Sequence, residues 1–120
     1  MTEAEFYQQL IKPWLVRQGG FFYRIDFDRV PDIYHCVGGK VTWYELKTTD
    51  KISKSGVVKP DWRPGQLSWI EEHYTKGGEG TDLKLLLWVV NQWYILPPQK
   101  QYLKEELTGG NRRPIHRRTR

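Results

Sequence analysis

The sequence predicts an α/β domain with a mixed central β-sheet flanked by helices, and three observations support this. Residues 83–90 are almost wholly apolar, which is typical of a central strand buried on both faces. Residues 41–47 are rich in β-branched and aromatic residues and follow Gly38-Gly39, which predicts a hairpin with residues 32–37. Apolar residues at helical spacing lie before and after this hairpin.

The expected elements follow the order α-β-β-β-α-β-β-α along the chain. They are a first helix that ends at Gly19-Gly20, strands at 21–28, 32–37 and 41–47, a helix from Arg63 to about Lys76, strands at 83–90 and 93–96, and a helix from about Gln99 to Leu107. Pro13 lies inside the first helical stretch and removes a backbone hydrogen bond. We therefore expect a kink or a division of the first helix at this point.

Length and composition limit the class of protein. A chain of 120 residues is long enough for one domain with a single core. The single cysteine, Cys36, excludes an internal disulfide and a cysteine zinc site. No apolar stretch approaches the length of a membrane span, and the N-terminus lacks the pattern of a signal peptide. The expected protein is soluble and intracellular.

The net charge of +5 is concentrated at the C-terminus. Residues 112–120 contain five arginines and no acidic residue, namely Arg112, Arg113, Arg117, Arg118 and Arg120. Gly109-Gly110 precedes them, and this segment has no apolar periodicity, so we expect a folded domain over residues 1–108 and a basic flexible tail over 109–120. Such a tail can hold phosphate backbones without reading sequence, or it can serve only to increase solubility.

Three residues of the predicted hairpin combine into a candidate catalytic group. Side chains alternate along a strand, so Glu45 and Lys47 share one face. A two-residue turn at Gly38-Gly39 also sets a register that places Asp32 opposite Glu45. The Pro31-Asp32 dipeptide and the Glu-x-Lys pattern each have an ordinary explanation when taken alone. Pro-Asp is a common turn dipeptide, and Glu-x-Lys is common on solvated strands. The combination in one register favours a site.

Two opposed carboxylates repel each other unless a cation lies between them. Carboxylate oxygens without a histidine or cysteine cluster favour Mg²⁺ or Mn²⁺ over zinc. The pattern therefore predicts a divalent metal at Asp32 and Glu45, with Lys47 beside it. This is the arrangement that a metal-dependent phosphodiesterase needs.

With these residues the chain resembles the PD-(D/E)xK nuclease superfamily, in particular the small VRR-NUC domains and Holliday-junction resolvase-like nucleases of phages and archaea. The resemblance covers roughly Thr2 to Leu96. Its motif residues are Glu3, Pro31-Asp32, Glu45-Leu46-Lys47 and the segment Arg63-Pro64-Gly65-Gln66. It implies a restriction-endonuclease-like core.

The resemblance also implies roles for the motif residues. Asp32 and Glu45 would bind Mg²⁺ or Mn²⁺, with the backbone carbonyl of Leu46 as a further ligand. Lys47 would orient or activate the attacking water. Glu3 and Gln66 would complete the catalytic site.

The first helix can also be interpreted without the resemblance. Thr2 and Glu5 have the spacing of a capping box, so Glu5 has a structural role at the helix start. Glu3 has no such role, and its position relative to the apolar stripe directs it towards the core side of the helix. The alternative is that Glu3 only interacts favourably with the helix dipole.

A basic segment separates the candidate strand from the next helix. Residues 50–62 contain Lys51, Lys54 and Lys59 among serines and a glycine, and the segment ends at Trp62. We expect a mobile loop that binds a DNA backbone together with Arg63, or a solvated loop whose Trp62 packs into the fold. The many aromatic residues of the chain are expected mainly in the core, although surface aromatic rings can stack on unpaired bases or form a subunit interface.

The function that these residues predict is a Mg²⁺-dependent endonuclease that cuts DNA. The resemblance implies branched or junction DNA as the partner, a homodimer, and a phage-type enzyme in the cytoplasm of a bacterial or phage-infected cell. A type II restriction-like enzyme would share the site but would need additional base-reading elements. A non-catalytic nucleic-acid-binding module on the same fold, and an RNA substrate, also stay open.

Overall fold

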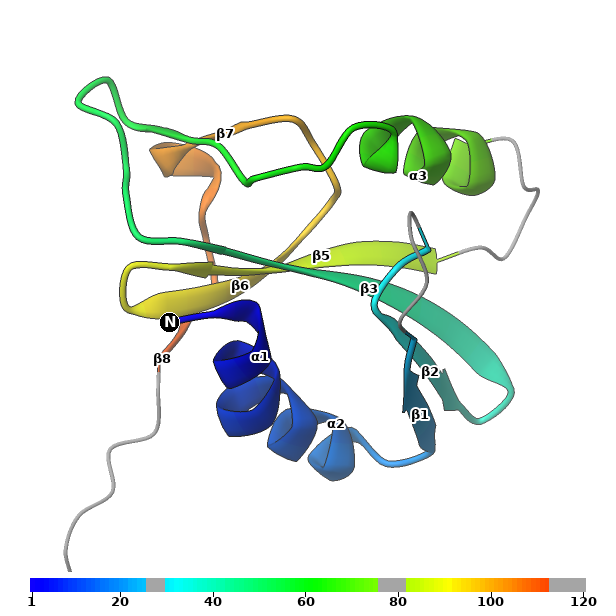
Figure 1. Cartoon of the computed structure of the whole chain (residues 1–120). Helices are drawn as coiled ribbons and strands as arrows, with labels where there is room; N and C mark the ends of the chain where they lie inside the picture. Colours follow the sequence, from blue (N-terminus) through cyan, green and yellow to red (C-terminus); the bar gives the residue numbers. More distant parts are fainter. Residues whose placement is uncertain (26–29, 76–81, 113–120) are drawn as a thin grey trace, which may run out of the picture.

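The computed structural model describes residues 1–25, 30–75 and 82–112 of the chain (Figure 1). The helical elements are α1 (Glu3–Phe6), the π-helix η1 (Tyr7–Ile11), α2 (Lys12–Gln18), α3 (Gln66–Thr75) and the 3-10 helix η2 (Lys104–Glu106). The strands are β1 (Phe21–Arg24), β2 (Ile33–Val37), β3 (Lys40–Thr49), β4 (Val57–Val58), β5 (Asp82–Val89), β6 (Gln92–Leu96), β7 (Tyr102–Leu103) and β8 (Asn111–Arg112).

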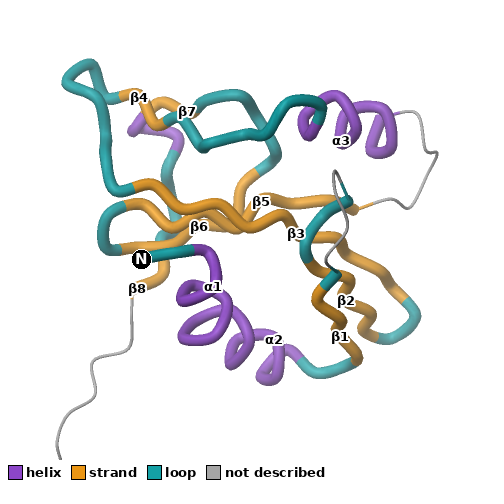
Figure 2. Tube along the Cα trace, viewed as in Figure 1, coloured by secondary structure: helices purple, strands orange, loops and turns teal. Residues whose placement is uncertain are grey.

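The main sheet is mixed and has six strands in the order β1-β2-β3-β5-β6-β8. Strands β3 and β5 pair in parallel at its centre, whereas the other neighbours pair antiparallel. The segment formed by α1, η1 and α2 covers one face, and α3 lies on the other with the two-stranded sheet of β4 and β7 (Figures 1 and 2). The predicted fold class, a mixed sheet flanked by helices, is confirmed.

Strand β5 contributes to a hydrophobic core on each face of the sheet. Leu86 and Trp88 belong to the core under the first helical segment. Leu85 and Leu87 belong to the core on the opposite face, where they are fully buried. Because alternate residues of a strand point to opposite faces, only a continuously apolar strand can fill both cores. This confirms the prediction of a doubly buried strand.

The first helical segment is divided, as the position of Pro13 predicts. The Lys12 N–H donates to the Tyr7 carbonyl, which is the wider spacing of a π-turn, and α2 then begins with Pro13 in its first turn. Proline is tolerated there because the first N–H groups of a helix have no intrahelical partner. The π-turn therefore accommodates the proline without ending the helical path.

The predicted C-terminal helix from Gln99 to Leu107 is wrong. Residues 102–103 form β7, which pairs antiparallel with β4, and only the 3-10 turn η2 follows. Tyr102 is 1% exposed, and its hydroxyl donates to the Pro97 carbonyl and accepts from the Gln99 N–H. This pairing and the buried tyrosine hold the segment extended. The predicted order of elements therefore fails at its last member.

Other boundaries also differ from the predictions. The first strand was expected at residues 21–28, but β1 ends at Arg24 and residues 26–29 lie outside the described residues. The loop at residues 50–62 contains the short strand β4, whose Val58 is fully buried. Within the expected tail at residues 109–120, residues 111–112 form β8, which pairs with β6. Residues 113–120, with Arg113, Arg117 and Arg118, lie outside the described part.

Among the described residues, no helix is long and apolar enough to cross a membrane.

Candidate active site

The β2–β3 hairpin brings Asp32 to Glu45. Its ladder pairs Val37 with Lys40 and ends at the pair Ile33 and Tyr44, so Asp32 and Glu45 occupy the next step. The Asp32 carboxylate accepts a hydrogen bond of 2.8 Å from the Leu46 N–H, which fixes its orientation at the edge of β3. The register predicted from the Gly-Gly turn is therefore confirmed.

Glu45 and Lys47 are buried beside each other on one face of β3. Their side chains are 2% and 4% exposed, and Lys47 Nζ lies 3.9 Å from Glu45 Oε1. Taking two charges out of water is costly, and the cost is offset only if each group keeps close polar partners. The Glu45–Lys47 pair therefore needs polar partners in addition to its own electrostatic attraction.

Gln66 supplies these additional polar contacts. Lys47 Nζ donates to Gln66 Oε1 at 3.0 Å, and Gln66 Nε2 donates to Glu45 Oε1 at 3.2 Å. The glutamine is itself 1% exposed. The sequence placed Gln66 at the edge of the site, whereas the structure places it between the two charged groups.

The turn before α3 holds Gln66 in this position. Gly65 has a φ of +84°, which a residue with a side chain rarely adopts, and α3 begins directly after it. The Gln66 N–H donates to the Arg63 carbonyl at 3.1 Å, and its Oε1 accepts from the Arg63 N–H at 2.6 Å. The segment Arg63-Pro64-Gly65-Gln66 thus positions Gln66 to hydrogen-bond both members of the Glu45–Lys47 pair.

Glu3 approaches the same ammonium from α1. The predicted capping box is present, because the Glu5 N–H donates to the Thr2 hydroxyl and the Thr2 N–H donates to the Glu5 carboxylate. Glu3 is left free of this cap, and its Oε1 lies 3.9 Å from Lys47 Nζ. Burial raises the pKa of Glu3, Lys47 lowers it and Asp32 raises it. The structure therefore brings Glu3, Asp32, Glu45, Lys47 and Gln66 together.

The surroundings of Glu45 disfavour its ionised form when no cation is present. Burial, followed by the charge of Asp32 and the hydrogen bond with the Asp32 carboxyl, raises the pKa of Glu45 to about 9. A divalent cation bound between the two carboxylates would offset their repulsion. Among the described residues, no group of three or more histidine, cysteine, aspartate or glutamate side chains forms a metal cage. Two carboxylates with open positions match Mg²⁺, which usually retains waters and takes substrate phosphate.

Trp62 covers the ammonium of Lys47. The centre of the Trp62 ring lies 5.5 Å from Lys47 Nζ, and its indole N–H donates to the Gln99 carbonyl at 2.9 Å. Trp62 also packs against the core cluster around Val58, Leu85 and Leu87, whereas the DNA-binding role of the loop stays a prediction. The contact with Lys47 has no signature in the sequence, because Lys47 and Trp62 are 15 positions apart and share no helix or strand.

The residues predicted to bind phosphate lie on several parts of the described structure. Lys51, Lys54, Lys59 and Arg63 are exposed, and the loop that carries the first two is organised by a Ser53–Ser55 hydrogen bond of 3.0 Å. Arg112 belongs to β8 at the other edge of the sheet. The lysine loop and Arg63 are therefore on the surface, as a DNA-binding role requires, and that role stays a prediction.

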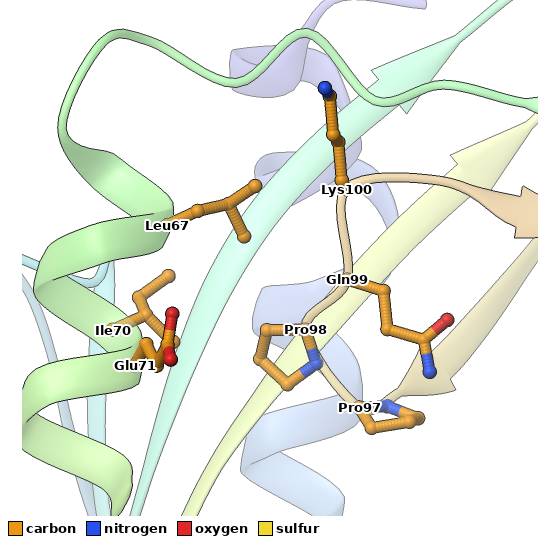
Figure 3. Close-up of a pocket in the computed structure, with 7 residues that line it drawn as sticks. All are labelled: Leu67, Ile70, Glu71, Pro97, Pro98, Gln99 and Lys100. Carbon is orange, nitrogen blue, oxygen red and sulfur yellow. The ribbon is translucent and has the colours of Figure 1, made fainter. Parts of the chain in front are cut away.

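A cavity of about 400 Å³ lies elsewhere, between α3 and the segment that follows β6 (Figure 3). Leu67 and Ile70 of α3 face Pro97 and Pro98 across it, and Glu71, Gln99 and Lys100 complete its lining. None of the five site residues lines it. The carboxylates and this apolar cavity are therefore separate features.

The sequence matches no protein-family model and no curated protein sequence. The fold, in contrast, is similar to the crystal structure of Archaeoglobus fulgidus Hjc, a Holliday junction resolvase from an archaeal hyperthermophile. The similarity has a TM-score of 0.64 and covers 92% of this chain and 90% of that chain, at 15% sequence identity. The chain therefore has the fold of this resolvase. The expected restriction-endonuclease-like core is confirmed.

We predict that Gln66→Ala lowers the free energy of unfolding by about 2 kcal/mol or more, because it leaves the buried Lys47 ammonium and the Arg63 N–H without their acceptor. Chemical denaturation measures this change. Ser68→Ala, at an exposed position of the same helix, is the matched control and should stay within about 0.5 kcal/mol of the wild type. Equal effects of both substitutions would show that Gln66 does not support the ion pair.

Proposed function

We propose that this protein is a metal-dependent endonuclease that hydrolyses phosphodiester bonds of DNA. The observation that carries the proposal is the contact of Asp32 with Glu45 beside the buried Lys47. The fold similarity to a Holliday junction resolvase supports the same class of reaction. Mg²⁺, or Mn²⁺ in its place, is the cofactor that this donor set fits best.

Asp32 and Glu45 would hold the cation, and the backbone carbonyl of Leu46 would be a further ligand. A bound divalent cation would supply a water of lowered pKa and stabilise the negative charge that develops on the phosphate. The hydrogen bond from Leu46 keeps the Asp32 carboxylate oriented before the metal arrives. A preorganised ligand of this kind reduces the reorganisation that the reaction requires.

Lys47 would position the attacking water or a phosphate oxygen. Its ammonium is held by Gln66 at 3.0 Å and lies 3.9 Å from both Glu45 and Glu3. These contacts fix the direction of a flexible side chain. In a buried position the charge also acts more strongly on a nearby phosphate than it would in water. Glu3, whose side chain is 44% exposed, would contact a second metal through water.

Branched DNA is the substrate that we propose. The similar structure is that of a Holliday junction resolvase, and a chain of 120 residues leaves little room for elements that read base sequence. Resolving a junction needs two cuts, so the proposal includes a homodimer. The narrower assignment to a phage-type VRR-NUC enzyme, acting in the cytoplasm of a bacterial or phage-infected cell, rests on the motif residues.

We predict that the wild type cuts labelled Holliday junction, flap or linear duplex DNA with Mg²⁺ and not with EDTA. Lys47→Ala and Asp32→Asn should each lower the cleavage rate roughly 100-fold or more, because each removes a charge that acts on the phosphate or its metal. Asp32→Asn should keep DNA binding, since the amide occupies nearly the same volume. The ranking of the three substrates separates a resolvase from a general endonuclease.

Lys84→Ala is the matched control for these variants. Lys84 lies on the neighbouring strand β5, points to the opposite face of the sheet and is 45% exposed, so its removal should leave cleavage unchanged. Tight junction binding by the wild type without any cutting would reject the nuclease and favour a non-catalytic binding module.

We also predict that deletion of residues 113–120 weakens DNA binding and flattens its salt dependence. The cut leaves β8 intact and removes four arginines, so the slope of log affinity against log salt should fall by roughly 3 to 4 for duplex DNA. A full-length variant with these arginines replaced by glutamine separates the effect of charge from that of length. An unchanged slope in both variants would exclude the tail from DNA binding.

A further inference from the structure

Three aromatic side chains form a row across the first three strands of the sheet. Tyr23 of β1 pairs with Tyr34 of β2, and Tyr34 pairs with Trp43 of β3. The ring centres of Tyr23 and Tyr34 are 6.1 Å apart, and those of Tyr34 and Trp43 are 5.4 Å apart. Rings at these separations contact each other. We call Tyr23, Tyr34 and Trp43 the aromatic row.

The aromatic row lies on the same face of the sheet as the candidate active site. Trp43 precedes Glu45 by two positions on β3, so both side chains point to one face, with Cα atoms roughly 6.8 Å apart. From Trp43 the row crosses two strand spacings of about 4.8 Å each to Tyr23 on β1. β1 is an edge strand of the main sheet. The row thus leads from the carboxylates to the rim of the protein.

The row is not part of the hydrophobic core in the described part of the chain. Tyr23 is 61% exposed, and Tyr34 and Trp43 are half-buried. The aromatic residues that fill the core differ clearly, since Trp88 and Trp93 are 6% and 4% exposed. Neither core cluster includes a member of the row, within the residues that the structure describes. Core packing therefore does not explain these three rings.

Positive charge lies near the end of the row that is closest to the carboxylates. Arg63 is exposed and lies close enough to Glu3 to lower its pKa. Arg24 also lowers the pKa of Glu3, but it follows Tyr23 on β1 and therefore points to the opposite face, with its guanidinium 4.6 Å from the centre of the Tyr7 ring. Arg63 would attract phosphates, whereas the row offers flat apolar faces. This pairing of charge and rings matches the chemistry of a nucleic-acid strand.

We propose that the aromatic row binds unpaired nucleobases of the DNA strand that enters the active site, by stacking on Tyr23 and on the rings beside it. The proposal rests on the proposed nuclease function and specifies its substrate as a strand with unpaired bases next to the cut. Stacking on an aromatic ring tolerates any base, because every base has a π-face. The row would therefore select strand structure without selecting sequence.

The test measures the affinity of the full chain for a single-stranded oligonucleotide that carries the fluorescent base 2-aminopurine, and for a duplex of the same sequence. Tyr23→Ala should weaken single-strand binding about 10-fold and reduce the quenching of 2-aminopurine, because loss of one stacked base costs about 1–3 kcal/mol. Since no phosphate contact is removed, the slope of log affinity against log salt should stay unchanged. Trp43→Leu provides a second variant nearer the carboxylates.

Phe21→Ala is the matched control. Phe21 lies on the same strand and the same face as Tyr23 and is 72% exposed, but it pairs with Cys36 and is outside the aromatic row. It should bind the single strand as the wild type does. Equal losses in Phe21→Ala and Tyr23→Ala, together with a change from dimer to monomer in light scattering, would overturn the proposal and identify the face as a subunit interface.

Two further outcomes separate this proposal from the proposed function. If the wild type binds duplex, junction and single-stranded DNA, and Tyr23→Ala and Trp43→Leu bind the single strand equally well, stacking is rejected and the nuclease proposal stands. If the wild type binds none of these DNAs, both proposals are overturned.

Discussion

The ammonium of Lys47 lies in the protein interior, and several elements of the fold converge to make that position tolerable. Strand β3 carries Lys47 and Glu45, the start of α3 brings Gln66, and the start of α1 brings Glu3. Removing one partner of a buried ion pair typically costs roughly 3–5 kcal/mol. The relative placement of the central strand and of two helix starts is therefore constrained by the contacts of one cation.

The same contacts give the site its chemical character. Glu45 is buried against Asp32, and its pKa is raised because burial and the negative charge of Asp32 both disfavour its ionised form. Lys47 only partly relieves this conflict, since it is engaged by Gln66 and Glu3 as well. A hydrophobic replacement of such an ion pair is often neutral or stabilising for a fold. Its presence is better explained by a demand for charge at this place.

The sequence was sufficient to predict that Asp32, Glu45 and Lys47 lie together, because the positions of these residues are set by local features of one hairpin. The Gly38-Gly39 turn determines which residue faces Glu45, and strand alternation determines that Lys47 shares its face. The doubly buried β5 was predictable for a similar reason, since a continuous apolar run of its length is typical of a central strand. These patterns lie within a few residues of the feature that they specify.

Features that depend on distant pairing could not be predicted in this way. β4 and β7 are two residues each and are separated by α3, β5 and β6, so no local pattern reveals them. Their pairing replaces the expected C-terminal helix with an extended segment. It also accompanies the packing of Trp62 over Lys47. The central position of Gln66 was missed because it depends on how α3 docks on the sheet.

The most direct test of the metal site is calorimetric titration of the protein with Mg²⁺ and Mn²⁺ in the absence of DNA. The wild type should bind the cations, and Asp32→Asn and Glu45→Gln should each abolish that binding, because each removes one charge of the carboxyl pair. Asp61→Asn, at an exposed position, should bind as the wild type does. Binding of equal strength in the wild type and in both carboxyl variants would show that Asp32 and Glu45 do not form a metal site.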